Sequence, residues 1–196
     1  MEFGGPVALK LASPDVTHKT EVGGVMLGVA PDEAGAAYER ILDAVRRKAP
    51  RARVEGVLVA PMAGDGLELI VGARDDPVFG PVTMVGMGGI FVEVLRDVVL
   101  RVGAVSVEEA RRMLAELKGA TLLEGARGRL QADVDAAAEA ISRLSALAVA
   151  NEGRFESIEI NPILVRPRGQ GAVALDALIV AKCATIPALG PTAGPG

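Results

Sequence analysis

The hydrophobic residues of this chain occur in short runs, so the fold must consist of many short buried elements. They make up 50% of the 196 residues, but each run is about as long as one strand and is interrupted by glycine, proline or charge. Aromatic residues are only 3% of the chain, so valine, isoleucine, leucine, alanine and methionine must form the core. This pattern predicts an α/β (α+β) protein with buried strands. No run is long enough to span a bilayer, so no membrane partner is expected.

Charge and cysteine content argue against a nucleic-acid-binding protein and against a protein stabilised by intrachain disulfides. The formal net charge of −4 leaves no basic field for a nucleic-acid backbone. Cys183 is the single cysteine, which excludes an intrachain disulfide and fits a reducing, cytoplasmic location. The N-terminus lacks the basic patch and apolar core of a signal peptide.

Three segments have the hydrophobic period of an amphipathic helix. The first is expected to begin at Pro31, where the missing N–H is tolerated, and to end at the cations of residues 46–48. The second covers residues 106–118 and begins with a Ser-x-x-Glu capping box. The third is a long alanine-rich helix over residues 130–149.

The remaining apolar runs predict strands. Gly64 and Gly66 lie between two of them, which predicts a hairpin of strands 54–59 and 67–71. Residues 74–81 and 119–128 are expected to be loops. The expected strands are residues 6–12, 25–29, 54–59, 67–71, 82–85, 90–95, 98–102, 155–160, 162–165 and 173–180.

The densest polar stretch, residues 13–24, follows the first strand and contains the only histidine, His18. Neutral imidazole is nucleophilic and can accept a phosphoryl group. Hydroxyls, a lysine and the expected open amides of Gly23 and Gly24 lie beside His18; a surface histidine without a role is the alternative. Lys10 lies in the preceding strand, where it is expected either to hold a phosphate or to protect a sheet edge.

Two carboxylates and an amide form a second candidate site. Glu159 and Asn161 lie two residues apart in a predicted strand, so their side chains should project from the same face. Pro162 is expected to end the pairing of that strand. Asp176 lies in an apolar strand, where an unpaired carboxylate is costly. Oxygen ligands from adjacent strands suit Mg²⁺ bound together with phosphate; a hydrogen-bonded turn and one satisfied aspartate are the alternative.

Two further motifs are less specific. Arg74 can hold a phosphate through two N–H groups, or it can pair with Asp75 and Asp76. The glycine-rich residues 86–89 allow a close approach of the backbone to an anion, or they form a plain turn. They match neither the dinucleotide fingerprint nor a P-loop.

These motifs, in this order, resemble the ATP-grasp subunit of the ADP-forming acyl-CoA synthetases, which include acetate–CoA ligase (ADP-forming) and are related to succinyl-CoA synthetase. The resemblance implies an ATP-grasp domain over residues 1–184, with mixed or antiparallel sheets flanked by helices. It implies lobes at about 1–62 and 63–184 and the absence of an N-terminal segment that family members carry. The Pro/Gly/Ala-rich composition of residues 185–196 predicts a flexible tail. The matching segments are residues 7–25, 68–72, 79–81, 86–93, 122–128, 159–162 and 176–177.

The resemblance also implies roles for particular residues. Lys10 would contact the nucleotide phosphates, and Glu68 would lie near the nucleotide. His18 looks like the family's second phosphohistidine, and Glu159 like the carboxylate that orients a visiting phosphohistidine. Asn161 and Asp176 would ligate Mg²⁺, and backbone groups of the hinge strand would hold the adenine. The hinge residues are Val59, Ala60, Pro61 and Met62.

The implied reaction converts acyl-CoA, ADP and phosphate into carboxylate, CoA and ATP, reversibly and through phosphohistidine. The implied cofactors are ATP or ADP and Mg²⁺. The implied partner is a CoA-binding and ligase subunit, or a domain of the same longer chain, in a hetero-oligomer or a self-associating protein. Two alternatives remain open. One is a regulatory or scaffolding module of a protein acetyltransferase-type fusion, and the other is an inert fragment that dimerises through the strand at residues 7–11.

Overall fold

The computed structural model describes residues 4–89, 97–125 and 130–182. The chain divides into two compact units, residues 1–64 (the N-terminal unit) and residues 65–196 (the C-terminal unit). No helix among the described residues is long and apolar enough to cross a membrane. The expected strand at 90–95 and the expected tail at 185–196 lie outside the described residues.

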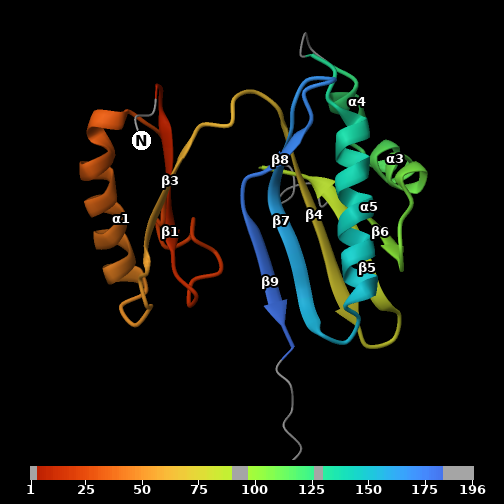
Figure 1. The fold of residues 1–196 in the computed structure, drawn as a ribbon, viewed down its shortest axis with the longest axis horizontal. Helices are drawn as coiled ribbons and strands as arrows, with labels where there is room; N and C mark the ends of the chain where they lie inside the picture. Colours follow the sequence, from red (N-terminus) through yellow and green to blue (C-terminus); the bar gives the residue numbers. More distant parts are fainter. Residues whose placement is uncertain (1–3, 90–96, 126–129, 183–196) are drawn as a thin grey trace, which may run out of the picture. The chain divides into compact units, whose positions relative to one another are not determined.

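The N-terminal unit is a three-stranded antiparallel sheet in the order β2-β1-β3, with one helix on it (Figure 1). Leu9 and Leu11 of the central strand pack with Ile41 of the helix, and all three are almost fully buried. The helix begins after Pro31 and ends with three cations, as predicted. The elements are β1 (Val7–Ala12), β2 (Val25–Val29), the 3₁₀ helix η1 (Pro31–Glu33), α1 (Ala34–Lys48) and β3 (Gly56–Pro61).

The C-terminal unit is a larger antiparallel sheet, ordered β6-β5-β4-β7-β8, and β9 also pairs with β7. The helices α3 and α5 pack on one face of this sheet (Figure 1), where Val71, Val85 and Ile141 belong to one buried cluster. The elements are β4 (Leu67–Asp76), β5 (Gly80–Met87), β6 (Val98–Val102), α3 (Val107–Glu116), α4 (Ala120–Leu123), α5 (Val134–Ala150), β7 (Phe155–Val165), β8 (Ala172–Ala174) and β9 (Ala177–Ala181).

The other face of this sheet is called the far face below. Residues of β4 that alternate with the buried Leu69, Val71 and Ala73 project from the far face. The register of the sheet extends this assignment from β4 to its neighbours, because directly paired residues of antiparallel strands share a face.

The predicted hairpin of strands 54–59 and 67–71 is wrong. β3 pairs with β1 in the N-terminal unit, whereas β4 belongs to the other sheet. The actual hairpin joins β4 to β5, and its turn consists of residues 77–79 inside the segment predicted as a loop. The carboxylate of Asp76 accepts the amides of Val78 and Phe79, at 2.9 and 3.0 Å, and so closes this turn.

Other boundaries also differ from the prediction. The third long helix begins at Val134 rather than residue 130, because Asp133 caps its N-terminus through the amide of Ala136. The loop expected at 119–128 contains α4. The strand expected at 173–180 is divided into β8 and β9, which are separated by Leu175 and Asp176.

Candidate functional site

The clearest polar site lies on the far face of the C-terminal unit. Glu159 pairs with Gly72, and Ile158 pairs with the buried Ala73, so Glu159 projects from the face opposite α5. The Nδ2 atom of Asn161 donates a hydrogen bond to Oε1 of Glu159 at 2.8 Å. This contact confirms that the two side chains lie on one face.

β7 has a β-bulge at Asn161 and contacts the third predicted residue, Asp176, on its other side. Val71 pairs with Ile160 and Leu69 pairs with Ile163, so Asn161 and Pro162 of β7 stand opposite one residue of β4. On the other side of β7, the amide of Asn161 donates to the carbonyl of Asp176 at 3.1 Å. The structure therefore brings together Glu159, Asn161 and Asp176.

The expectation that Pro162 ends the pairing of its strand is wrong. β7 continues to Val165 and still pairs with β4. A proline is accommodated here because the bulge removes the need for its missing amide hydrogen. The carbonyl of Pro162 accepts the amide of Leu175 at 2.9 Å, and the Asn161–Pro162 peptide bond is cis.

Glu68 and Arg74 lie in β4 at even spacing from Gly72, so they also belong to the far face. Arg74 is exposed and pairs in register with Ser157 and Val82. The neighbouring carboxylates have other partners. Asp76 closes the hairpin turn, and the amides of that turn lower the pKa of its carboxyl. Asp75 accepts hydrogen bonds from Gly153 and Lys182, so the alternative in which Arg74 serves mainly to pair with these aspartates loses support.

The glycine-rich turn at residues 86–89 is hydrogen-bonded to the backbone of Glu68. The amide of Gly88 donates to the carbonyl of Glu68 at 2.7 Å, and a Cβ at position 88 would lie 2.7 Å from backbone atoms of Glu68. Gly88 is therefore needed for this close approach of two chain segments. Its amide is already used within the protein, which supports the plain-turn alternative at this position.

In the N-terminal unit, Lys10 lies in the central strand and is half-buried. It pairs with Val25 on one side and Leu58 on the other. The edge-protecting alternative for Lys10 is therefore wrong, because both neighbouring positions are occupied by strands. Its neighbours Leu9 and Leu11 pack toward α1, so Lys10 projects from the opposite face.

His18 is exposed on a compact loop between β1 and β2. The amide of Gly24 donates to the carbonyl of Lys19 at 2.7 Å, and that of Gly23 donates to Thr20 at 3.0 Å. The expectation of open amides at Gly23 and Gly24 is thus wrong. These glycines are needed for close packing instead, since a Cβ on Gly24 would lie 2.9 Å from the carbonyl of Lys19.

The four predicted hinge residues are at the end of β3, an edge strand of the N-terminal sheet. Val59, Ala60 and Pro61 pair with β1, and the amide of Met62 donates to the carbonyl of Pro6 at 3.3 Å. The bond from Met62 to Pro6 marks a hydrogen-bonded pair of the antiparallel ladder, and such pairs occur at every second residue. The backbone groups of Ala60 therefore face β1, and the N–H and C=O of Val59 face away from it.

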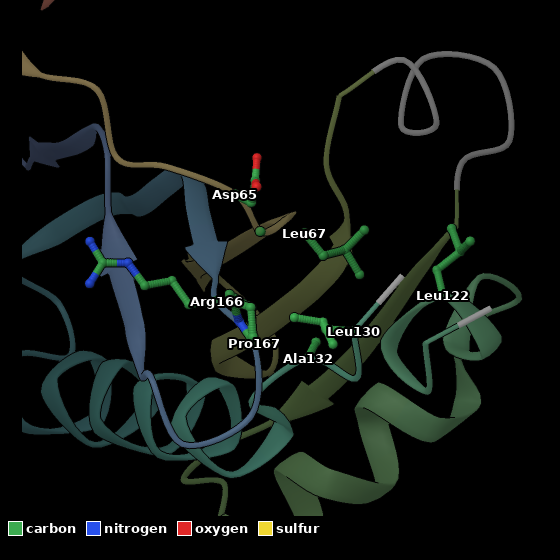
Figure 2. A pocket seen from close by; sticks show the side chains of 9 residues that line it. Asp65, Leu67, Leu122, Leu130, Ala132, Arg166 and Pro167 are labelled. Atoms are coloured by element: carbon green, nitrogen blue, oxygen red, sulfur yellow. The ribbon is translucent and has the colours of Figure 1, made fainter. Parts of the chain in front are cut away.

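A cavity of about 290 Å³ in the C-terminal unit lies elsewhere. Figure 2 shows Leu67, Leu130 and Ala132 gathered around it, whereas the side chain of Arg166 extends away from them. None of the predicted site residues is in its described lining. Besides these apolar residues, its lining includes Asp65 and Arg166.

Comparison with known proteins decides the family. A model of the ATP-grasp domain matches residues 1–181. Subunit beta of acetate–CoA ligase (ADP-forming) II from Pyrococcus furiosus is 40% identical over 182 residues, which are 92% of this chain and 77% of that protein. The chain belongs to the ATP-grasp family. The resemblance, the fold class and the expectation of an acid–CoA ligase (ADP-forming) subunit are confirmed at this level.

The same domain is similar to part of a longer relative and to solved structures. Acetate–CoA ligase (ADP-forming) I of Archaeoglobus fulgidus is 45% identical over 171 residues, which are 87% of this chain but only 25% of that protein. A structure of the dinucleotide forming acetyl-coenzyme A synthetase 1 of Ca. Korarchaeum cryptofilum, in complex with coenzyme A, Ca-AMPCP and HgCl+, has a TM-score of 0.85 and 40% identity, covering 91% of this chain and 77% of that one.

A second structure of the Korarchaeum enzyme contains coenzyme A and Mg-AMPPCP, with its phosphohistidine segment pointing towards the nucleotide binding site. It has a TM-score of 0.74 and 36% identity, and the match covers 91% of this chain and 78% of that chain. These proteins share the ATP-grasp domain with this chain.

Proposed function

We propose that this chain is the nucleotide-binding phosphotransfer part of an ADP-forming acyl-CoA synthetase, which converts acyl-CoA, ADP and phosphate into carboxylate, CoA and ATP. The observation that carries the proposal is the row of oxygen donors on the far face. The side chain of Asn161 donates a hydrogen bond to Glu159, and its backbone amide donates to the carbonyl of Asp176, inside a domain of the ATP-grasp family. Relatives named as acetate–CoA ligases support the reaction class.

The donor set fits Mg²⁺ held together with a nucleotide. The Nδ2 atom of Asn161 is bonded to Glu159, so its Oδ1 atom is the end that can face a cation. Asp176 adds a carboxylate, and Mg²⁺ prefers oxygen ligands. Among the described residues no three acidic, histidine or cysteine side chains gather into a metal cage. Such a partial set suits Mg²⁺, which takes its remaining ligands from phosphates and water and would neutralise phosphate charge there.

The remaining predicted residues supply contacts for the nucleotide in this proposal. The outward N–H and C=O of Val59, at the end of β3, can hydrogen-bond the edge of a base. Lys10 and Arg74 supply positive charge for phosphate oxygens, and the planar fork of Arg74 suits a bidentate contact. Glu68 is fixed through its backbone by Gly88 and faces the same side of its sheet as Arg74.

His18 relays the phosphoryl group in this proposal. Its neutral ring nitrogen attacks the phosphorus of a phosphohistidine on the partner, so one P–N bond forms as the donor's P–N bond breaks, and the donor imidazole leaves. A terminal oxygen of ADP then attacks the phosphorus, which forms ATP and returns His18. Glu159 orients the visiting imidazole by accepting its other N–H. The exposure of His18 on its loop suits exchange with a partner.

Labelling of His18 tests this relay. Incubation of the chain with radiolabelled ATP, Mg²⁺ and the CoA-binding subunit is expected to give an acid-labile label at His18. The substitution His18→Asn should abolish that label while leaving ADP binding unchanged. A label that persists in the variant would remove His18 from the mechanism.

Calorimetry tests nucleotide and metal binding separately from turnover. The wild-type chain is expected to bind ADP more tightly with Mg²⁺ than with EDTA. Asp176→Asn should lose most of that difference, and Glu156→Gln, which changes an exposed acid in the same strand as Glu159, should keep it. A wild-type chain that binds neither ADP nor Mg²⁺ would favour the regulatory or scaffolding module instead.

A further inference from the structure

The far face of the C-terminal unit carries a row of apolar side chains that the proposed reaction does not use. Val98, Leu100 and Val102 of β6 alternate with inward residues and are 40%, 55% and 60% exposed. Leu100 pairs with Met84 and Val102 pairs with Val82, so residues of β5 extend the row on the same face. We name Val82, Met84, Val98, Leu100 and Val102 the apolar strip. Exposed apolar patches of this kind mark interaction sites.

The apolar strip belongs to the same face as the proposed phosphotransfer residues. Met84 pairs with Gly72, and Gly72 pairs with Glu159, so these three positions form one row across β5, β4 and β7. Two strand spacings separate Met84 from Glu159, about 10 Å. Because the middle position is glycine, no side chain stands between the strip and the carboxylate of Glu159.

The outer edge of β6 disfavours the addition of another strand. The guanidinium of Arg101 is held by Glu109 and Glu116 of the α3 region, at 2.7 and 2.5 Å. Its Nη1 atom also donates to the carbonyl of Leu100 at 2.9 Å. A carbonyl with this partner is a poorer acceptor for an incoming strand. The strip therefore suits docking through side chains rather than backbone pairing.

We propose that the apolar strip docks the segment of the CoA-binding polypeptide that carries the phosphohistidine, with apolar residues beside that histidine packing on Leu100 and Val102. This inference rests on the proposed function and names where its partner binds. The choice of occupant follows from the position of the apolar strip in the same row of the sheet as Glu159. A segment bound on the strip can present an imidazole to Glu159 across Gly72. The matched residues are only 25% of acetate–CoA ligase (ADP-forming) I of Archaeoglobus fulgidus, so the remaining sequence of such a ligase can supply the segment.

Paired variants test the docking. Leu100→Thr combined with Val102→Thr removes apolar surface while keeping residues that favour strands. Ile179→Thr is the matched control, because Ile179 is 61% exposed in β9 but pairs with the buried Ile158 and so belongs to the helix-covered face. Each variant is assembled with its CoA-binding polypeptide. ATP formation is then measured with two phosphoryl donors, the phosphorylated polypeptide and free phosphohistidine.

The double variant is expected to raise KM for the phosphorylated polypeptide about tenfold, the loss typical of two interface side chains, and to leave kcat within about twofold. Its rate with free phosphohistidine and its affinity for ADP should equal those of the wild type. An unchanged KM, or an equal rise in the Ile179→Thr control, would overturn the docking while the phosphotransfer proposal stands. Absence of ADP binding or of any phosphotransfer in the wild-type chain would remove the proposed function and the docking with it.

Discussion

Asp133 shows how one side chain can connect two distant segments. Its Oδ1 atom accepts the amide of Ala136 at the start of α5, and its Oδ2 atom accepts the amide of Gly171 at 2.9 Å. The hydrogen bond from Gly171 is the main cause that lowers the pKa of this carboxyl. Asp133 therefore caps a helix and fastens the turn between β7 and β8 with a single carboxylate.

Asp133→Ala is expected to lower the free energy of unfolding by about 1–2 kcal/mol, because a lost N-cap costs this much and the amide of Gly171 loses its partner. Asp133→Asn should cost less, since its amide oxygen can still accept one hydrogen bond. Urea unfolding of the two variants at neutral pH measures both values. Equal stability of Asp133→Ala and the wild type would contradict the capping role.

Thr83, unlike Asp133, has a buried polar atom without a hydrogen-bond partner among the described residues. It is fully buried in β5, and its Oγ1 atom has no hydrogen-bond partner among the described residues. Thr83→Val keeps the shape of the side chain and removes the unsatisfied hydroxyl. We expect the free energy of unfolding to rise by about 1 kcal/mol, measured by urea unfolding. Thr83→Ser is the control and should destabilise the protein, because it keeps the hydroxyl and loses a methyl group.

At the scale of elements, β9 is fastened at its end by an ion pair. The Nζ atom of Lys182, just after β9, contacts Oδ2 of Asp75 in β4 at 2.5 Å, and the side chain of Asp75 is only 5% exposed. The amide of Gly153 donates to the same oxygen. These contacts join the end of β9 to β4 and to the turn before β7.

The pH dependence of stability tests this attachment. The hydrogen bond from Lys182 lowers the pKa of Asp75 from its ordinary value of 3.8. A lowered folded-state pKa stabilises the fold above pH 3.8, and the stabilisation is lost as the pH falls through the lower folded-state value. Asp75→Asn and Lys182→Met should each flatten the acid side of the profile of unfolding free energy against pH. Profiles parallel to that of the wild type would contradict this.

At the scale of the whole molecule, the two units have separate cores. The buried cluster of the N-terminal unit contains Leu9, Leu11 and Ile41, and that of the C-terminal unit contains Val71, Val85 and Ile141. The cluster of the C-terminal unit is much the larger among the described residues. A domain of about 60 residues, such as the N-terminal unit, buries a smaller fraction of its surface and is correspondingly marginal.

We therefore expect residues 65–182 to fold when expressed alone, with a cooperative urea transition and dispersed amide resonances. Residues 1–64 alone should unfold at a much lower urea concentration. If the proposed function holds, the fragment 65–182 should bind ADP more weakly than the whole chain, because Lys10 and the end of β3 are missing. Calorimetry measures this, and equal affinity would remove those residues from nucleotide binding.

Sequence patterns that span about four residues predicted the local structure of those residues well. The predicted helix start was confirmed, since the Oγ atom of Ser106 accepts the amide of Glu109 as an N-cap; the carboxylate of Glu109 contacts Arg101 and Arg112. The two-residue spacing of Glu159 and Asn161 placed both side chains on one face, as their hydrogen bond confirms. Pairing between distant segments could not be predicted from such local patterns. The prediction that β3 pairs with β4 and the prediction that pairing of β7 ends at Pro162 were therefore both wrong.

Periodicity, caps and motif order are properties of neighbouring residues, so the local elements, the family and the residue types of the candidate site can be inferred without coordinates. The three-dimensional fold was needed to establish that Lys10 lies in a central strand, that the amides of Gly23 and Gly24 are already hydrogen-bonded, and that the amide of Asn161 donates to the carbonyl of Asp176. These outcomes depend on which strands pair. Strand pairing is selected by burial over the whole sheet rather than by any one segment.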